Sequence, residues 1–497
     1  MKGAWIALTC LLLVGAAKNP CAAAPPPTPM SPTGSPSWRS TEPAPGASRT
    51  WAPTVRHGAL SNGLPVYVVQ NPTMPMITIS LVVRGGSGDN PPQSPGLANV
   101  LTTLLAQGAG GRSAIELSER SADLGGAIKA ETTSDYSAIR VTCLAERLEQ
   151  ALALLADLST RPTFTEGGLM AVLADVETQV QKDGNKGSAV AERVLRSVVY
   201  GARHPYAHGD LGSIDSVRRL SLPDLRAHYE AYWTSSNAAV VVAGDVTFER
   251  ALPLVDRAFA SWRARGVPKH TAKATLAPAV RRIVMVDRPG AALGDVMVGQ
   301  LMSPLVVADG AALDVMVQVL GGSYSARLNR VLRLDKGYTY SARAKLLLRR
   351  HGSMLLLRGG MHLEKTALAI KEIETVVGRM ISHPPDQEEF ARARSLSLAR
   401  LADRFATQEQ AVSAVAELVA SGQPADGYAR QVRMLGALTL SDVVKATRAL
   451  RPNALSIVVA GPASKLEPQF AASGLQPVER WPSPPARTTA PTGPSPR

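Results

Sequence analysis

The chain has 497 residues, of which 45% are apolar and 19% charged, as in a folded globular protein with an ample core. Its length exceeds that of one typical core, so we expect two domains. The formal net charge is +14, yet aromatic residues make up only 4%. This argues against a nucleic-acid binder, which combines basic patches with aromatic residues, and leaves an acidic peptide or an acidic partner protein open.

Residues 1–24 have the outline of a secretory signal peptide. Lys2 precedes an apolar run over residues 4–17, and the segment ends in three alanines, Ala22–Ala24. The run is shorter than the ~20 apolar residues that a membrane span needs. We therefore expect export, to the periplasm of a bacterium. Lipid anchoring at Cys10 or Cys21 is the weaker alternative, because the small residues that lipoprotein processing prefers do not precede either cysteine.

Two segments rich in proline and small polar residues flank the body, at residues 25–53 and 476–497. Neither can bury enough apolar surface to offset its chain entropy, so we expect both to be disordered. After signal cleavage Cys143 is the remaining cysteine, which excludes an internal disulfide. It lies in an alternating apolar run, and we expect it to be a buried small side chain.

The body divides into two similar halves, residues 54–265 and 278–475, with residues 266–277 as the linker. The segment LSLPDL at residues 220–225 is echoed by LTLSDV at residues 438–443. Each segment reads as a helix start, with Ser221 or Thr439 as the cap, and each helix leads to an apolar strand, at residues 237–244 and 453–461. This correspondence indicates an internal duplication.

Within each half, strand patterns and helical patterns occur in blocks, which favours an α+β fold over strict alternation. Helical spacing of apolar residues marks residues 97–105 and 148–155. The predicted strands, apart from the two that end the halves, are residues 64–69, 77–83, 128–133, 139–144, 282–286, 296–301, 340–347 and 352–357.

Residues 96–108 read GLANVLTTLLAQG, which resembles the first helix of the pitrilysin and insulinase family of zinc metallopeptidases, the family of the mitochondrial processing peptidases. In that family the helix carries an inverted zinc motif, H-x-x-E-H, whose histidines bind the metal and whose glutamate activates water. The matching positions here are Asn99, Thr102 and Thr103. The third zinc ligand of the family, a glutamate, aligns with Gln179; a shift of register by two residues would instead bring in Glu177.

Amides and hydroxyls at all four positions replace the imidazoles and carboxylates that zinc prefers. A threonine hydroxyl also cannot act as a general base near neutral pH. We therefore predict no catalytic residue and no metal in this chain.

Near the other end, residues 323–340 read SYSARLNRVLRLDKGYTY, which resembles the Arg/Tyr substrate-binding motif of the same family. In the family an arginine and a tyrosine seven positions apart reach the substrate backbone, and Arg333 and Tyr340 have that spacing. A guanidinium and a phenol can both donate to a peptide carbonyl or to its tetrahedral oxyanion. On spacing alone, a solvated Arg333 and an ordinary strand tyrosine remain the alternative.

The resemblance covers nearly the whole body and implies two similar α/β sandwich domains, each a mostly antiparallel sheet backed by helices. It also implies a role. Some members work as two-chain enzymes, in which one subunit holds the zinc and the other supplies the Arg/Tyr pair, and this chain resembles the second kind. The expected partners are a homologous catalytic subunit that holds the zinc and a peptide substrate. The alternatives are an inactive structural or peptide-holding scaffold and, more remotely, an independent zinc endopeptidase.

The segment HPYAH at residues 204–208 places two histidines four positions apart. Pro205 disrupts the helix that would bring them onto one face, so we predict a loop rather than a metal site.

Overall fold

The computed structural model describes residues 51, 54–268, 280–302, 310–476 and 478–481. The expected signal peptide at 1–24, most of 25–53, most of the linker at 266–277 and most of the tail at 476–497 lie outside the described residues. No helix in the described ranges is both long enough and apolar enough to cross a bilayer.

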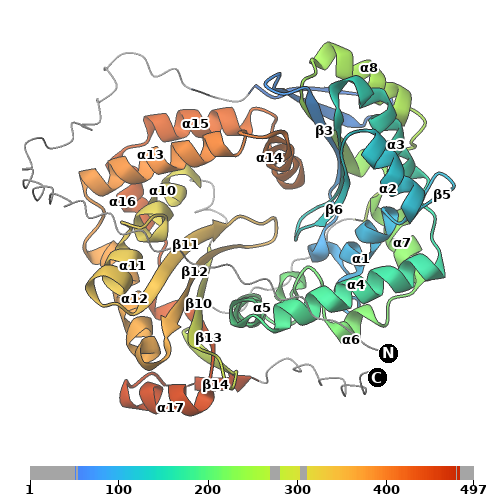
Figure 1. Cartoon of the computed structure of the whole chain (residues 1–497). Helices are drawn as coiled ribbons and strands as arrows, with labels where there is room; N and C mark the ends of the chain where they lie inside the picture. Colours follow the sequence, from blue (N-terminus) through green and yellow to red (C-terminus); the bar gives the residue numbers. More distant parts are fainter. Residues whose placement is uncertain (1–50, 52–53, 269–279, 303–309, 477, 482–497) are drawn as a thin grey trace, which may run out of the picture. The chain divides into compact units, whose positions relative to one another are not determined.

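Two six-stranded sheets organise the described chain (Figure 1). The first sheet has the order β1 (Arg56–Ala59), β2 (Pro65–Gln70), β8 (Ala238–Gly244), β3 (Met76–Val83), β7 (Ser137–Leu144) and β6 (Ile128–Thr132). The second has the order β11 (Thr339–Leu347), β12 (Ser353–His362), β10 (Leu293–Met302), β13 (Ser456–Gly461), β9 (Arg282–Asp287) and β14 (Val478–Trp481). A short pair, β4 (Gly108–Ala109) and β5 (Arg112–Ser113), stands apart from both.

The two sheets have the same plan. Read from the other edge, strands β9, β13, β10, β12 and β11 of the second sheet match β2, β8, β3, β7 and β6 of the first. The outermost strands differ, because β1 is antiparallel to β2 whereas β14 is parallel to β9. In each sheet the first long strand pairs in parallel with the last buried strand, β2 with β8 and β9 with β13. The inner pairs that follow are antiparallel in both. This is what an internal duplication predicts, and the expected α+β fold of two mostly antiparallel sheets is confirmed.

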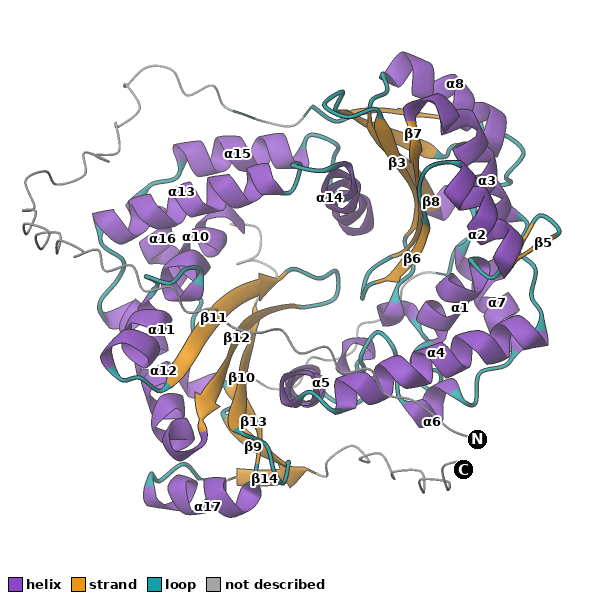
Figure 2. Cartoon of the chain, in the orientation of Figure 1, coloured by secondary structure: helices purple, strands orange, loops and turns teal. Residues whose placement is uncertain are grey.

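Helices pack against both sheets (Figure 2). The helices of the first half are α1 (Leu97–Leu105), α2 (Ala114–Asp123), α3 (Leu148–Thr160), α4 (Glu166–Gly184), α5 (Gly187–Tyr200), α6 (Ile214–Val217), α7 (Leu222–Tyr232) and α8 (Phe248–Phe259). In the second half they are α10 (Gly310–Gly321), α11 (Arg327–Asn329), α12 (Thr366–Ser382), α13 (Gln387–Asp403), α14 (Gln408–Ser421), α15 (Gly427–Ala437), α16 (Leu440–Thr447) and α17 (Ala463–Ala472).

Each half contributes one helix that packs on the sheet of the other half. Helix α5 of the first half packs on β10 and β13, and α14 of the second half packs on β3 and β8. Val190, Leu195 and Val199 of α5 share a buried core with Val284 and Val458. The exchange explains why the strands near the sheet centres, such as β8, are buried on both faces and read as continuous apolar runs.

The repeated helix starts are built alike. Ser221 N–H bonds to Asp224 Oδ2 at 3.0 Å before α7, and Thr439 N–H bonds to Asp442 Oδ2 at 3.1 Å before α16. The Asp442 N–H also bonds back to Thr439 Oγ1, so this cap is reciprocal. The strand predicted over residues 453–461 begins later, at Ser456, because a short 3₁₀ turn occupies Pro452–Ala454.

Candidate functional site

Helix α1 carries the three positions that match the inverted zinc motif. The left-handed backbone of Gly96, with φ of 96°, turns the chain into the helix, and Asn90 Oδ1 accepts the N–H of Ala98 at 2.9 Å. Asn99 and Thr103 are half-buried, whereas Thr102 is fully buried.

A chain of hydroxyls surrounds Thr102, at the position of the family's catalytic glutamate. Thr102 Oγ1 donates to the carbonyl of Ala98 at 2.7 Å and accepts from Thr132 Oγ1 at 3.1 Å. Thr132 lies 3.3 Å from Ser137 Oγ, which donates to the carbonyl of Gly85 at 2.7 Å. The position that matches the water-activating carboxylate is thus occupied by a neutral hydroxyl whose hydrogen bonds are satisfied.

The position of the third ligand lies on α4. Gln179 is exposed, next to the buried row of this helix at Leu169, Val172, Val176 and Val180. Glu177, the carboxylate that a register shift would recruit, is bound on both oxygens by Arg218 at 2.8 and 2.7 Å. Its hydrogen bonds with Arg218 lower the pKa of Glu177. This carboxylate is already paired.

These residues do not fit a zinc ion. Asn99, Thr102 and Thr103 offer no imidazole, thiolate or carboxylate, and the Thr102 oxygen is already shared with Thr132. Within the described ranges no group of three or more His, Cys, Asp or Glu side chains could hold a metal ion. We derive no metal chemistry from this chain.

The second predicted pair is brought into contact. The guanidinium carbon of Arg333 lies 4.9 Å from the ring centroid of Tyr340 and 4.3 Å from that of Tyr324. The two rings are largely exposed, at 76% and 53%. Such cation–π contacts hold a guanidinium by its faces and leave the N–H groups at its edge available to an acceptor.

Local backbone geometry sets this arrangement. Arg333 lies in a π-helical stretch, Arg330–Asp335, where Lys336 N–H bonds to Val331 O at 3.1 Å. Such stretches are rare and are frequent at functional sites. The helix ends at Gly337, whose φ of 63° is left-handed, and the chain then enters β11 with Tyr340 near its start.

One buried amide joins the two segments that carry the rings. Asn329, only 3% exposed, donates from Nδ2 to the carbonyl of Ser323 at 2.7 Å and accepts the N–H of Ala342 at 2.8 Å. Ser323 precedes Tyr324, and Ala342 follows Tyr340 on β11. Asn329 is therefore a positioning residue for the clamp that Tyr324, Arg333 and Tyr340 form, which we call the Arg333 clamp.

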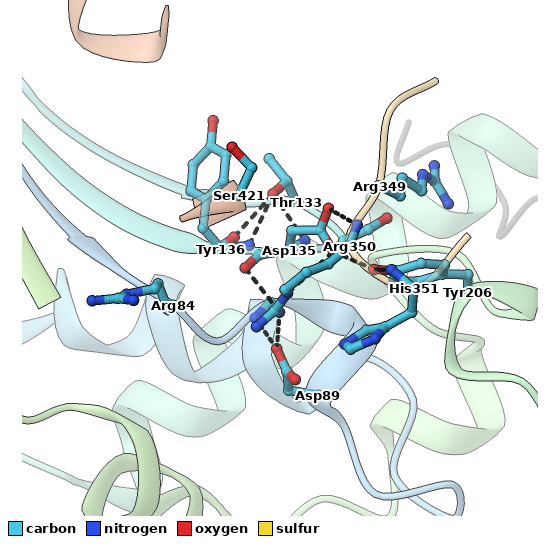
Figure 3. Close-up of polar contacts among 12 residues, drawn as sticks. Arg84, Asp89, Thr133, Asp135, Tyr136, Tyr206, Arg349, Arg350, His351 and Ser421 are labelled. Carbon is cyan, nitrogen blue, oxygen red and sulfur yellow. Dashed lines mark hydrogen bonds and ion pairs between the residues drawn. The ribbon is translucent and has the colours of Figure 1, made fainter. Parts of the chain in front are cut away.

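A separate polar cluster ties the two halves together at the turn between β11 and β12 (Figure 3). Arg350 Nη2 donates to Asp89 Oδ2 at 2.9 Å and to the carbonyl of Asp135 at 3.2 Å. Tyr206 donates to the Asp135 carboxylate and accepts the N–H of His351 at 3.2 Å. The side chain of Asp89 is only 3% exposed.

Electrostatics holds this cluster in its charged form. Burial alone would lower the pKa of Arg350, but Asp89 and Asp135 outweigh burial and raise it. Burial, followed by the charge of Asp135, raises the pKa of Tyr206. The phenol therefore stays protonated and donates. A cavity of about 580 Å³ adjoins the cluster, with Glu131, Asp135, Arg349 and Glu417 in its wall.

Models of known protein families match this chain in two stretches. The model of the insulinase peptidases, family M16, matches residues 66–204, and that of the peptidase M16 inactive domain matches residues 219–397. The chain belongs to the M16 family. Together the two matches cover well over half of its length.

Among curated relatives, the M16 chain is similar to a zinc protease of Bacillus subtilis, YmxG, described as uncharacterised. The two are 25% identical over 315 residues, 62% of this chain and 73% of that protein. A non-peptidase homologue from Helicobacter pylori is 23% identical over 287 residues, 56% of this chain and 64% of its own length.

Solved structures show the same fold at low sequence identity. A peptidase M16 inactive domain from Pseudomonas fluorescens superposes with a TM-score of 0.75 at 22% identity, over 82% of this chain and 98% of that one. A chain of Complex III2 from Candida albicans superposes with a TM-score of 0.70 at 13% identity, over 84% of this chain and 100% of that one. The periplasmic protease PqqL from Escherichia coli superposes with a TM-score of 0.68 at 15% identity, over 88% of this chain and 52% of that one.

The remaining candidates of the M16 chain have structural roles. His204 is buried, and its Nδ1 accepts the N–H of Tyr206 at 3.0 Å in a 3₁₀ turn, Pro205–Ala207. The segment predicted to be a loop is therefore a short ordered turn. Cys143 is fully buried on β7, and burial raises the pKa of its thiol to about 12. It is a packing residue, as expected.

Two features were missed at the sequence level. Tyr324 completes the Arg333 clamp. It lies in the segment that resembles the Arg/Tyr motif, but nothing in the sequence pointed to its contact with Arg333. The Arg350 cluster left no sequence signal, because Asp89 and Arg350 are 261 positions apart.

Proposed function

We propose that this M16 chain is the non-catalytic, substrate-binding subunit of an exported, heterodimeric zinc metallopeptidase whose zinc is bound by a homologous partner chain. The observation that carries the proposal is the Arg333 clamp. An arginine in cation–π contact with both Tyr324 and Tyr340 is present in a chain whose α1 offers no metal ligands.

Arg333 has the chemistry that peptide cleavage requires from a second subunit. Its guanidinium can donate to a substrate carbonyl, and more strongly to the oxyanion that forms when that carbonyl is attacked. The Tyr340 phenol can add a second donor. The cation–π contacts with the two tyrosine rings keep the guanidinium in place before substrate arrives.

The substrate is a peptide bound through its backbone. Both sheets end in strands that pair on one side only within the described chain, β6 and β11 among them. A peptide strand can add to such an edge with little preference for sequence. Strand β6 packs beside α1. A peptide added to β6 would therefore lie next to a helix that offers no metal ligands in this chain.

Export rests on residues 1–24, which have the three parts of a signal peptide. A periplasmic protease, PqqL, shares the fold and is consistent with a periplasmic location for this chain.

A structural or peptide-holding scaffold is the second candidate. Its support is the fold shared with a chain of Complex III2 and the non-peptidase homologue among the relatives. The Arg333 clamp favours the peptidase subunit, because a scaffold has no need of a guanidinium presented by two exposed tyrosines. An independent peptidase would need ligands that Asn99, Thr102 and Thr103 do not provide.

Co-purification tests the proposal. The tagged chain, isolated from its native cell, is expected to bring down a homologous chain with an intact H-x-x-E-H motif and peptidase activity that chelation abolishes. The tagged chain purified without any partner serves as the control and is expected to show no activity. Recovery without any peptidase activity, or with no homologous partner, would favour the scaffold.

A further inference from the structure

The outer strands of the second sheet carry an uncompensated cluster of positive charge. Arg343 and Lys345 on β11 and Arg358 on β12 are all exposed. We call these three residues the cationic face. Ala342 and Ala344 are buried, so by strand alternation Arg343 and Lys345 point to the opposite side of β11. The register shifts between Thr339 and Ala342, and this bulge keeps the buried Thr339 on the side of Ala342 and leaves the exposed Tyr340 on the side of Arg343.

Two of these charges oppose each other directly. Arg343 and Arg358 are cross-strand partners, which places their Cβ atoms about 4.5–5.5 Å apart. Like charges in this position destabilise a sheet. An arrangement that costs stability needs another reason, and an anionic ligand would supply it.

Some other arginines of this half are paired with carboxylates. Arg327 lies 2.6 Å from Glu389, and Arg350 lies 2.9 Å from Asp89. By contrast, no carboxylate in the described ranges comes within ion-pair distance of Arg343, Lys345 or Arg358.

The register does bring one carboxylate, Asp295, onto this side of the sheet, opposite Gly360. Asp295 Oδ2 lies close to the start of α5, since a Cβ atom added to Gly187 would be only 2.1 Å from it. Burial raises the pKa of Asp295, with Arg288 opposing that rise. Asp295 is therefore half-buried under α5 rather than neutralising the exposed arginines.

We propose that the cationic face binds the carboxylate side chains of an acidic peptide whose backbone is held at the Arg333 clamp. This inference rests on the proposed function, because it adds a side-chain preference to the same substrate site. Tyr340 and Arg343 lie on one side of one strand, so a peptide at the clamp passes over the cationic face as it continues.

Spacing defines the preferred sequence. Arg343 and Lys345 are two residues apart on a strand, or about 6.6–6.8 Å. Alternate side chains of an extended peptide have the same spacing. The face therefore selects peptides with Glu or Asp at every second position.

A binding experiment tests the preference without any catalysis. The probes are three fluorescent peptides: one with glutamate at alternate positions, one with glutamine in their place, and one with the glutamates grouped together. Fluorescence anisotropy is measured with the purified full chain. The alternating acidic peptide is expected to bind roughly tenfold more tightly than the glutamine peptide, because the contributions of several exposed ion pairs, each small, add together. The difference should shrink as salt rises.

The matched variants are Arg343→Gln with Lys345→Gln and Arg358→Gln, against Arg203→Gln with Arg219→Gln and Lys371→Gln. Both triples remove three exposed positive charges. The first is expected to lose the roughly tenfold preference and to keep or raise the melting temperature, and the second to keep the preference.

Equal binding of acidic and amide peptides would overturn the proposal, as would no detectable binding or an equal loss in both triple variants. So would weaker capture of the partner subunit by the first triple with unchanged peptide binding, since the face would then be a subunit contact. Peptide affinity is read in the lone chain and partner capture in the complex, whereas failure of the proposed function is read separately, as absent peptidase activity with the partner.

Discussion

Arg333→Ala is expected to lower kcat of the two-chain peptidase by about 100-fold, with a smaller change in KM. Removal of one donor to a developing oxyanion typically costs this much. The effect falls on turnover because the bond to the guanidinium strengthens only as the carbonyl oxygen gains charge. Steady-state kinetics with a fixed amount of the partner chain measure it.

Two variants control this result. Arg330→Ala removes an exposed arginine from the same π-helical stretch and is expected to leave kcat unchanged. Arg333→Lys keeps the charge but loses the planar fork that contacts Tyr324 and Tyr340, so it should recover only part of the loss. Turnover of Arg333→Ala equal to that of the unaltered chain would remove the assigned role.

Arg350→Ala is expected to lower the free energy of unfolding by about 3–5 kcal/mol. The substitution leaves Asp89, whose side chain is 3% exposed, without its guanidinium partner. It also removes the donor to the carbonyl of Asp135 and with it part of the tie between the two halves. Urea unfolding followed by circular dichroism gives the change.

The exposed pair Arg257–Glu149 provides the comparison, with its side chains 67% and 57% exposed. Arg257→Ala is expected to cost at most about 1 kcal/mol. If Arg350→Ala costs no more than Arg257→Ala, the cluster at the β11–β12 turn does not hold the halves together.

Much of the fold could be read from the sequence because buried strands keep a simple pattern. The apolar run of β8 and the helical spacing in α1 were both placed within one residue of their observed bounds. The Arg333–Tyr340 pair was found through the resemblance of one local segment to the family's Arg/Tyr motif, and seven residues of chain span only a short distance.

What escaped prediction depends on contacts between distant residues. Asn329 bonds two segments through its amide, and a single asparagine in a sequence has no pattern that reveals such partners. The exchange of α5 and α14 was also missed, because an amphipathic helix shows that it has an apolar face but not which sheet covers it. The cationic face required the strand register, since only pairing shows that Arg343 and Arg358 are opposed.

The central claim is that this M16 chain has lost its own metal site and works with one held by another chain. Metal analysis of the purified chain, expressed with zinc in excess and then dialysed, tests this most directly. We expect far less than one zinc per chain and no change on Asn99→Ala or Thr103→Ala. One tightly held zinc that those substitutions release would contradict the account.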